Sequence, residues 1–89
     1  MAGKNILIVD DEEFLREALG YEFEKQGLNV FLAGDVPQAL EIFNSQEIDL
    51  ILSDYKMPKG SGVDLYQKAS SLKTKLKFVL LTGFADVTE

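Results

Sequence analysis

Short, unbroken runs of apolar residues constrain the fold of this 89-residue chain more than any other feature of its sequence. Residues 6–9 and 78–81 are each four apolar residues in a row, and residues 50–52 form a third run. Strands without polar alternation are typical of parallel sheets, in which helices cover both faces. Parallel strands need long crossover connections, so helices are expected between the runs. The pattern therefore predicts an α/β protein, and the length predicts a single domain.

Helix and strand signals alternate along the chain. Gly27 is a natural stop for a first helix, while Asp35 and Pro37 are typical of the cap and first turn of a second. The predicted strands are 4–9, 29–33, 49–53 and 77–82, and the predicted helices are 12–26, a segment beginning after Asp35, and 62–72. Residues 55–61 are expected to form a loop, and 83–89 a loop that leads to a further helix near Asp86.

The apolar residues of each helix predict which side faces the sheet. In the first helix the expected buried stripe is Phe14, Leu15, Ala18, Leu19 and Phe23, and the expected solvent side is Glu13, Arg16, Glu17, Glu24 and Lys25. Tyr21 is expected to be half-buried. The second helix is expected to bury Ala39, Leu40, Ile42 and Phe43, and the third Leu65, Tyr66, Ala69 and Leu72.

Composition excludes several classes of function. The formal net charge of -6, without a basic patch, argues against a nucleic-acid binder or a protein that binds anionic membranes. The sequence shows no signal peptide and no apolar stretch long enough to span a bilayer, and a cytoplasmic location is expected. The chain contains no His and no Cys, which excludes Ser-His-Asp and Cys-His nucleophiles and the usual zinc sites. Carboxylates, hydroxyls, lysines and oxygen-ligated metals are left to carry the chemistry.

Acidic residues follow two of the apolar runs. Asp54 follows the strand 49–53, and Asp10 and Asp11 follow the strand 4–9. Open α/β sheets place their ligand sites at the carboxyl ends of such strands. If the two strands are neighbours, their carboxylates converge, and the mutual repulsion favours a hard cation such as Mg²⁺, with a phosphoryl group beside it. Taken singly, Asp10 and Asp11 could equally cap the following helix, and Asp54 could be a turn residue; together they favour a functional site.

The residues around this cluster each have a plain structural interpretation as well. Thr82 ends the last strand, either as an ordinary strand-end residue or as a hydroxyl that meets a phosphoryl oxygen, and Gly83 leaves room beside it. Met57 and Pro58 form a turn, and Gly60 and Gly62 serve loop geometry and the start of the third helix, because their spacing is not that of a phosphate-binding loop. Lys56 and Lys59 are expected to be solvated, with phosphate contact as the minority interpretation.

Three motifs together resemble the receiver domains of two-component response regulators. They are residues 6–12 (ILIVDDE), residues 54–58 (DYKMP) with Gly62 eight positions after Asp54, and residues 80–83 (LLTG). The resemblance implies a flavodoxin-like parallel sheet with flanking helices and strand order 2-1-3-4. It implies that Asp54 is the phosphoacceptor. Asp11, Asp54 and the backbone carbonyl of Lys56 would ligate Mg²⁺, Asp10 would act through a bound water, and Thr82 would be the switch hydroxyl.

The resemblance also implies a partner, because the phosphoryl donor must come from outside a chain without His. In the family the donor is a phosphohistidine on a sensor histidine kinase or a histidine phosphotransfer protein. Receivers have a fourth helix, a fifth strand and a fifth helix, and residues 1–89 are expected to be one receiver domain without that portion. The strand-five lysine of the family has no counterpart here, since Lys77 is the last lysine. The strand 77–82 is then an exposed apolar edge, and the chain is expected to self-associate through this strand or by swapping elements.

Three functions follow from these features. The leading one is a phosphorelay receiver that accepts a phosphoryl group on Asp54 and changes conformation, assisting its own phosphorylation and dephosphorylation without acting as an enzyme on a separate substrate. The alternative is a non-phosphorylated, receiver-like interaction or dimerisation module. A metal-dependent phosphohydrolase is disfavoured, because its nucleophile is expected in an Asp-x-Asp pattern after the first strand, where this chain has Asp10-Asp11-Glu12.

Overall fold

The computed structural model describes residues 3–57, 59–73 and 76–81, with the backbone alone at Lys56. The parallel sheet consists of β1 (Asn5–Val9), β2 (Asn29–Ala33), β3 (Leu50–Asp54) and β6 (Lys77–Leu81). The helices are α1 (Glu13–Lys25), α2 (Val36–Ser45) and α3 (Gly62–Leu72), and a small hairpin consists of β4 (Lys56–Met57) and β5 (Gly60–Ser61). No helix in the described part of the chain is both long and apolar enough to cross a membrane.

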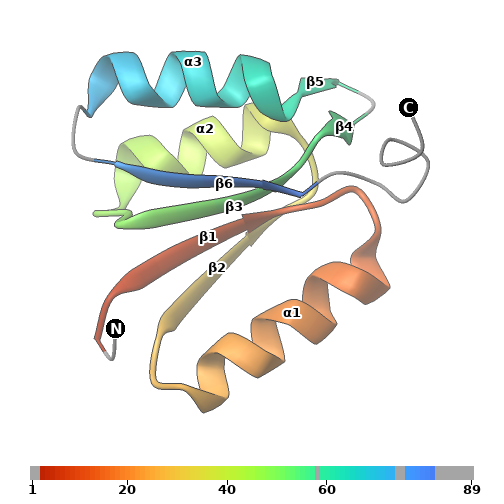
Figure 1. Cartoon of the computed structure of the whole chain (residues 1–89), viewed down its shortest axis with the longest axis vertical. Coiled ribbons are helices and arrows are strands. Elements are labelled where there is room, and N and C mark those ends of the chain that lie inside the picture. The colour runs from red at the N-terminus through yellow and green to blue at the C-terminus, as the bar shows by residue number, and fades with distance from the viewer. Residues whose placement is uncertain (1–2, 58, 74–75, 82–89) are drawn as a thin grey trace.

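The four parallel strands lie in the order β2-β1-β3-β6. Since β6 is the fourth strand of this sheet along the chain, the predicted order 2-1-3-4 is confirmed. One face of the sheet is covered by α1, and the other by α2 and α3, which pack against each other (Figure 1). The two central strands, β1 and β3, are hydrogen-bonded to each other with Val9 opposite Ser53, so both strands end at the same edge of the sheet.

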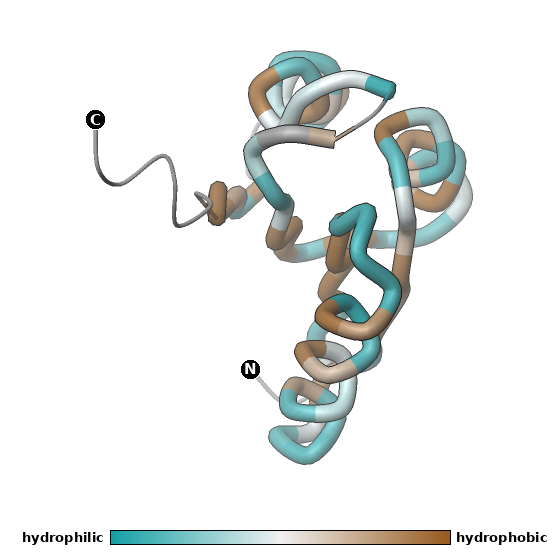
Figure 2. Tube along the Cα trace, turned by 90° about the vertical axis from the view of Figure 1, so that its right-hand side faces the viewer, coloured by the Kyte–Doolittle hydropathy of each residue, from teal (hydrophilic) through white to brown (hydrophobic). Residues whose placement is uncertain are grey.

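Each face of the sheet has its own apolar core, because strand side chains alternate between the two faces. Leu7, Val9 and Ile51 lie in the core beneath α2 and α3, and Ile6 and Ile8 lie in the core beneath α1. Residues 6–9 are at most 1% exposed, which confirms the predicted burial of this strand on both faces. The helices alternate between hydrophobic and hydrophilic residues along their turns, as expected for covering layers (Figure 2).

The predicted helix ends are confirmed. Gly27 has φ of +91°, and its N–H donates to the carbonyl of Glu24, so a glycine ends α1 in the left-handed region. The side chain of Asp35 accepts a hydrogen bond from the backbone N–H of Gln38 at 2.8 Å, and Pro37 lies in the first turn of α2. These local signals depend on residues close in sequence, which is why the sequence alone located them.

The predicted inward side of α1 is partly correct: Leu19 and Phe23 pack against the core beneath the helix, but the other three predicted residues do not. Phe14 is 88% exposed, Leu15 and Ala18 are also exposed, and Arg16 is half-buried. The inward side is set by Gly20, whose missing side chain lets α1 lie close to β2: a Cβ there would be 3.3 Å from the side chains of both Val30 and Leu32. Arg16, Gly20 and Phe23 follow at helical spacing on that side, and Phe14 lies opposite.

Three other burial predictions and one loop prediction also need correction. Tyr21, Tyr66 and Leu72 are 62%, 47% and 64% exposed, because α1 and α3 reach the sheet through other residues, such as Leu65 and Ala69 in α3. Tyr66 still contacts the ring of Phe78 edge-on, with 5.2 Å between the ring centroids. The predicted loop 55–61 contains the antiparallel β4–β5 pair, which is too short to have a recognisable periodicity.

Candidate functional site

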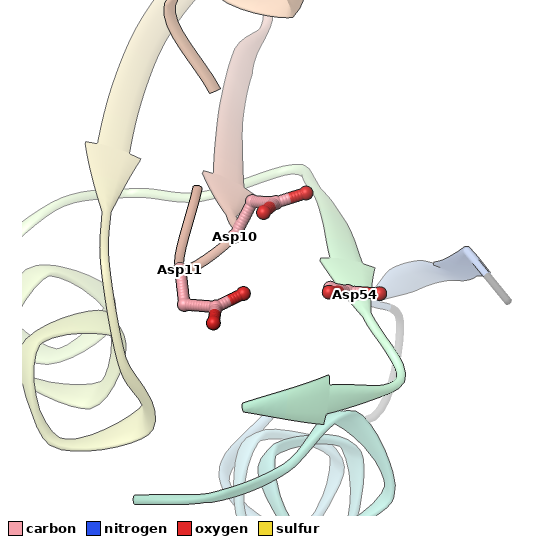
Figure 3. A group of neighbouring side chains, drawn as sticks. All are labelled: Asp10, Asp11 and Asp54. Carbon is pink, nitrogen blue, oxygen red and sulfur yellow. The ribbon is translucent and has the colours of Figure 1, made fainter. Parts of the chain in front are cut away.

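Three carboxylates meet at the carboxyl edge of the two central strands. Asp10 and Asp11 directly follow β1, and Asp54 is the last residue of β3. One carboxylate oxygen from each residue lies within 4.8 Å of the other two. Figure 3 shows the side chains of Asp10 and Asp11 on the loop after β1, both on the side where Asp54 lies. The convergence predicted from the two apolar runs is therefore present in the structure.

The three carboxylates differ in burial and in their contacts. Asp10 is 2% exposed, Asp11 is exposed, and Asp54 is intermediate. The Oδ1 atom of Asp10 accepts a hydrogen bond from the backbone N–H of Glu12 at 2.8 Å, while Glu12 itself is the cap residue of α1 and makes no side-chain cap bond. Asp10 thus stabilises the turn before the helix and is not the cap residue considered as an alternative above. A buried acid held this way keeps a fixed position beside its more exposed neighbours.

The backbone around Asp54 is tightly anchored. The N–H of Tyr55 lies 2.8 Å from Oδ1 of Asp54 and 2.9 Å from the carbonyl oxygen of Leu81, which joins the end of β3 to the end of β6. The carbonyl of Tyr55 accepts a hydrogen bond from the N–H of Gly62 at 2.8 Å. The loop after Asp54 is therefore tied to both β6 and the start of α3.

Gly62 is the glycine on which this arrangement depends most directly. A Cβ at this position would lie 2.4 Å from the carbonyl oxygen of Asp54, 2.4 Å from Cδ2 of Leu80 and 3.2 Å from Oγ of Ser53. No side chain fits there without moving the backbone of Asp54 or the helix. The sequence indicated only loop geometry for Gly62; the structure adds the reason, which is the close approach of α3 to the strand that carries Asp54.

The β4–β5 hairpin forms the side of the site next to Asp54. Met57 is 9% exposed and packs in the core beneath α2 and α3, so it anchors the hairpin rather than forming a simple turn. Gly60 has φ of +133°, a conformation that other residues rarely adopt. Nζ of Lys59 lies 3.8 Å from the carboxylate of Asp35, but Lys59 is 69% exposed, so this ion pair adds little stability.

Arg16 is a residue near the site that the sequence did not single out. Its Nη1 atom donates a hydrogen bond to the backbone carbonyl of Asp10 at 2.7 Å. The acceptor is a backbone atom, so no residue-type pattern in the sequence indicates this contact. Of the other predicted site residues, Pro58, Thr82 and Gly83 lie outside the described residues, and so does the side chain of Lys56, whose backbone belongs to β4.

The donor set fits a hard divalent cation. Three carboxylates so close together repel one another strongly unless a positive charge lies among them. Oxygen donors from carboxylates, with room for water on the exposed side of Asp11, match what Mg²⁺ prefers. Asp54 at the same edge is partly exposed, and a carboxylate of this kind can act as a nucleophile toward a phosphoryl group.

The comparison with known protein families decides the family. The model of the response regulator receiver domain matches residues 6–89. The chain belongs to this family. Receiver domains are signalling modules of two-component systems that bind Mg²⁺ at an acidic pocket, and Asp10, Asp11 and Asp54 form such a cluster in this chain.

Relatives and solved structures agree with the assignment. Over 87 residues the receiver is 30% identical to sporulation initiation phosphotransferase F of Bacillus subtilis, covering 98% of this chain and 70% of that protein. It is 34% identical to regulatory protein AtoC of Escherichia coli over 92% of this chain, but spans only 18% of AtoC. The fold also matches the response regulator TrrA of Thermotoga maritima in complex with Mg²⁺-BeF, with a TM-score of 0.87, 35% identity, and coverage of 93% of this chain and 72% of that chain. A structure of TrrA in complex with the histidine kinase ThkA matches with a TM-score of 0.84 and 36% identity, covering 91% and 70%.

Proposed function

We propose that this receiver accepts a phosphoryl group on Asp54 from a phosphohistidine donor, in a reaction that requires Mg²⁺. The observation that carries the proposal is the meeting of three carboxylates within 4.8 Å at the ends of β1 and β3, with Asp54 as the residue on β3. The likeness to TrrA, which was solved with Mg²⁺-BeF, supports the same conclusion. The proposed unit is the whole chain, residues 1–89, acting as one domain in the cytoplasm.

The residues of the site have separate roles in this proposal. A carboxylate oxygen of Asp54 attacks the phosphorus; the new P–O bond forms as the P–N bond to the donor imidazole breaks, and the imidazole keeps the electron pair. Asp11, Asp54 and the carbonyl of Lys56 would hold Mg²⁺ directly, and Asp10 through a water molecule. When bound, Mg²⁺ neutralises charge on the phosphoryl oxygens. The receiver turns over no separate substrate.

The switch is proposed to start at the end of β6. The hydrogen bond from Tyr55 to the carbonyl of Leu81 joins the loop after Asp54 to the last residue of β6. Thr82 follows directly in the sequence, and we propose that its hydroxyl moves toward the phosphoryl group, with Gly83 leaving room for the movement. Met57, Pro58 and Gly62 would keep the geometry of the neighbouring loop.

The exposed apolar residues at the start of α1 are proposed to contact the donor protein, a sensor histidine kinase or a histidine phosphotransfer protein. Phe14 is 88% exposed and Leu15 is 44% exposed, and both lie in the turn that follows Asp10 and Asp11. Exposed aromatic residues beside a polar site are typical of protein interfaces. The structure of TrrA with ThkA supports a kinase as the type of partner.

A second candidate function, an interaction module that self-associates, is favoured by the exposure of β6. Val79 and Leu80 are 46% and 38% exposed, and β6 has a neighbour on only one side in the described sheet. An apolar edge strand pairs readily with another chain. We propose that copies associate through β6 or by exchanging elements. Sedimentation velocity over a range of concentrations tests this, and a compact monomer at the highest concentration would exclude it.

The phosphorylation proposal is tested by intact mass after incubation with acetyl phosphate and Mg²⁺. We expect one phosphoryl adduct in the native chain, none in Asp54→Asn, and none when the metal is chelated. Asp49→Asn is the matched control, because Asp49 lies just before the start of β3, at the opposite end of the strand from Asp54. Its carboxylate accepts a hydrogen bond from the backbone N–H of Asn5. An adduct that persists in Asp54→Asn would show that Asp54 is not the acceptor. No adduct in the native chain, with Mg²⁺ bound, would favour the interaction module.

A further inference from the structure

The side chain of Arg16 connects α1 to the loop that carries two of the three carboxylates. Its Nη1 atom donates to the carbonyl oxygen of Asp10 at 2.7 Å, across six positions in the sequence. This carbonyl belongs to the peptide group between Asp10 and Asp11. This single hydrogen bond therefore restrains the peptide group that joins Asp10 to Asp11.

The contact is not an ion pair with the acidic cluster. Among the residues that the structure describes, no salt bridge joins Arg16 to a carboxylate. A guanidinium that bound the carboxylates would compete with a cation for the same oxygens. By donating to the backbone instead, Arg16 leaves those oxygens to the metal, and a charged donor makes a stronger hydrogen bond than a neutral one.

The residues around Arg16 leave space for its side chain to reach the carbonyl of Asp10. A Cβ at Gly34 would lie 3.1 Å from Nη1 of Arg16, closer than most side-chain contacts, so the glycine gives the guanidinium its room. The N–H of Gly34 is held by Oε1 of Gln38 at 2.8 Å. Next to Gly34, the carbonyl of Ala33 accepts the N–H of Asp10 at 3.1 Å. The loop is thus restrained from β2 through Asp10 N–H and from α1 through Asp10 C=O.

We propose that Arg16 is a positioning residue that holds the Asp10–Asp11 peptide so that both carboxylates face Asp54. The inference rests on the proposed Mg²⁺ site. The competing view is that Arg16 is only a nearby cation that offsets negative charge. The two views predict opposite results. Removing a mere cation strengthens Mg²⁺ binding, because less positive charge opposes the metal, whereas removing a positioning residue weakens it.

The first test is the Mg²⁺ affinity of Arg16→Met, measured by isothermal titration calorimetry. Met keeps an unbranched chain but has no charge and no donor. We expect binding to weaken about tenfold, the effect of losing one charge-assisted hydrogen bond. The matched control is Lys25→Met, which removes the same charge from the last turn of the same helix, where Lys25 pairs with Glu22. Binding in Arg16→Met that equals or exceeds the native affinity overturns the proposal.

A second readout does not depend on the metal. The N–H of Glu12 donates to Oδ1 of Asp10, so hydrogen exchange at this amide reports the order of the loop in metal-free protein. We expect exchange to be about tenfold faster in Arg16→Met than in Lys25→Met. Gly34→Ala displaces the guanidinium without removing it and is expected to change both readouts in the same direction, by less. This variant replaces Arg16→Met if the latter does not fold.

The two readouts separate the two proposals. If the native chain binds no Mg²⁺ while Arg16→Met speeds exchange at Glu12, the metal site fails and the positioning role of Arg16 stands. If exchange at Glu12 is unchanged in both Arg16→Met and Gly34→Ala, the positioning role is overturned, whatever the native chain binds.

Discussion

Replacing Gly62 with alanine tests whether α3 must touch the strand that carries Asp54. The new Cβ would be 2.4 Å from the carbonyl oxygen of Asp54 and 2.4 Å from Cδ2 of Leu80. Ordinary contact distances begin at about 3.5 Å, so the groups must separate by about 1 Å. The side chain of Leu80 can rotate away, but the Asp54 carbonyl is backbone, and relieving that contact moves either β3 or the whole first turn of α3.

The size of the effect follows from two opposing terms. Overpacking a well-filled site costs about 1–3 kcal/mol, and a clash with backbone belongs at the upper end. Alanine in place of glycine in a helix recovers up to about 1 kcal/mol. We therefore expect a net loss of about 2 kcal/mol in the free energy of unfolding, equivalent to a fall of about 10 °C in Tm for a domain of this size. Acceptance of a phosphoryl group by Asp54 should fall as well, because its backbone is displaced.

The measurement is urea unfolding followed by circular dichroism, together with intact mass after incubation with acetyl phosphate and Mg²⁺. Gly20→Ala is the control, since its Cβ would be 3.3 Å from the movable side-chain ends of Val30 and Leu32 and it lies inside α1. There the gain in helix propensity offsets the mild crowding, and the net change should be within about 1 kcal/mol. If Gly62→Ala unfolds at the same urea concentration as Gly20→Ala, the close approach of α3 to Asp54 is wrong.

Two further predictions concern surfaces. Phe14→Ala is expected to slow phosphoryl transfer from a partner kinase at least tenfold while leaving transfer from acetyl phosphate unchanged, because Phe14 is exposed and is not part of the core. Tyr21→Ala, on the same helix and 62% exposed, is the control. An equal loss of transfer from both phosphodonors would contradict a docking role. Val79→Lys is expected to reduce self-association seen by sedimentation velocity, because a lysine on an edge strand opposes pairing; Leu72→Lys places the same charge at another exposed apolar residue in α3, and an equal effect of both changes would show that charge alone, rather than β6, controls association.

The sheet and its acidic cluster were predictable because their signals are local and reinforce one another. Unbroken apolar runs identified β1, β3 and β6, and a parallel sheet brings the residues after neighbouring strands together without any further information. Only the adjacency of β1 and β3 had to be assumed for Asp10, Asp11 and Asp54 to converge, and the structure contains it.

What could not be predicted depends on contacts between distant segments. Gly20 sets how α1 packs against β2, so counting apolar residues selected Phe14 for burial and Arg16 for solvent, whereas Phe14 is exposed and Arg16 is half-buried. Arg16 donates to the backbone carbonyl of Asp10, and a backbone acceptor leaves no residue-type pattern in the sequence. The clash that requires glycine at position 62 appears only once α3 has packed against β3.

The strand order described above has a mechanical consequence for the receiver. β1 and β3, which carry the three carboxylates, are the interior strands, so the backbone of each is bonded to a neighbour on both sides. Opening such a strand requires breaking two ladders at once, and its cost approaches that of unfolding the whole domain. The acidic cluster therefore lies at the end of the most rigid strands of the described sheet, while the edge strands β2 and β6 can move at lower cost. We therefore expect that added charge at Asp54 would displace β6 more easily than β1 or β3. The hydrogen bond from Tyr55 to Leu81 connects the loop after Asp54 to β6.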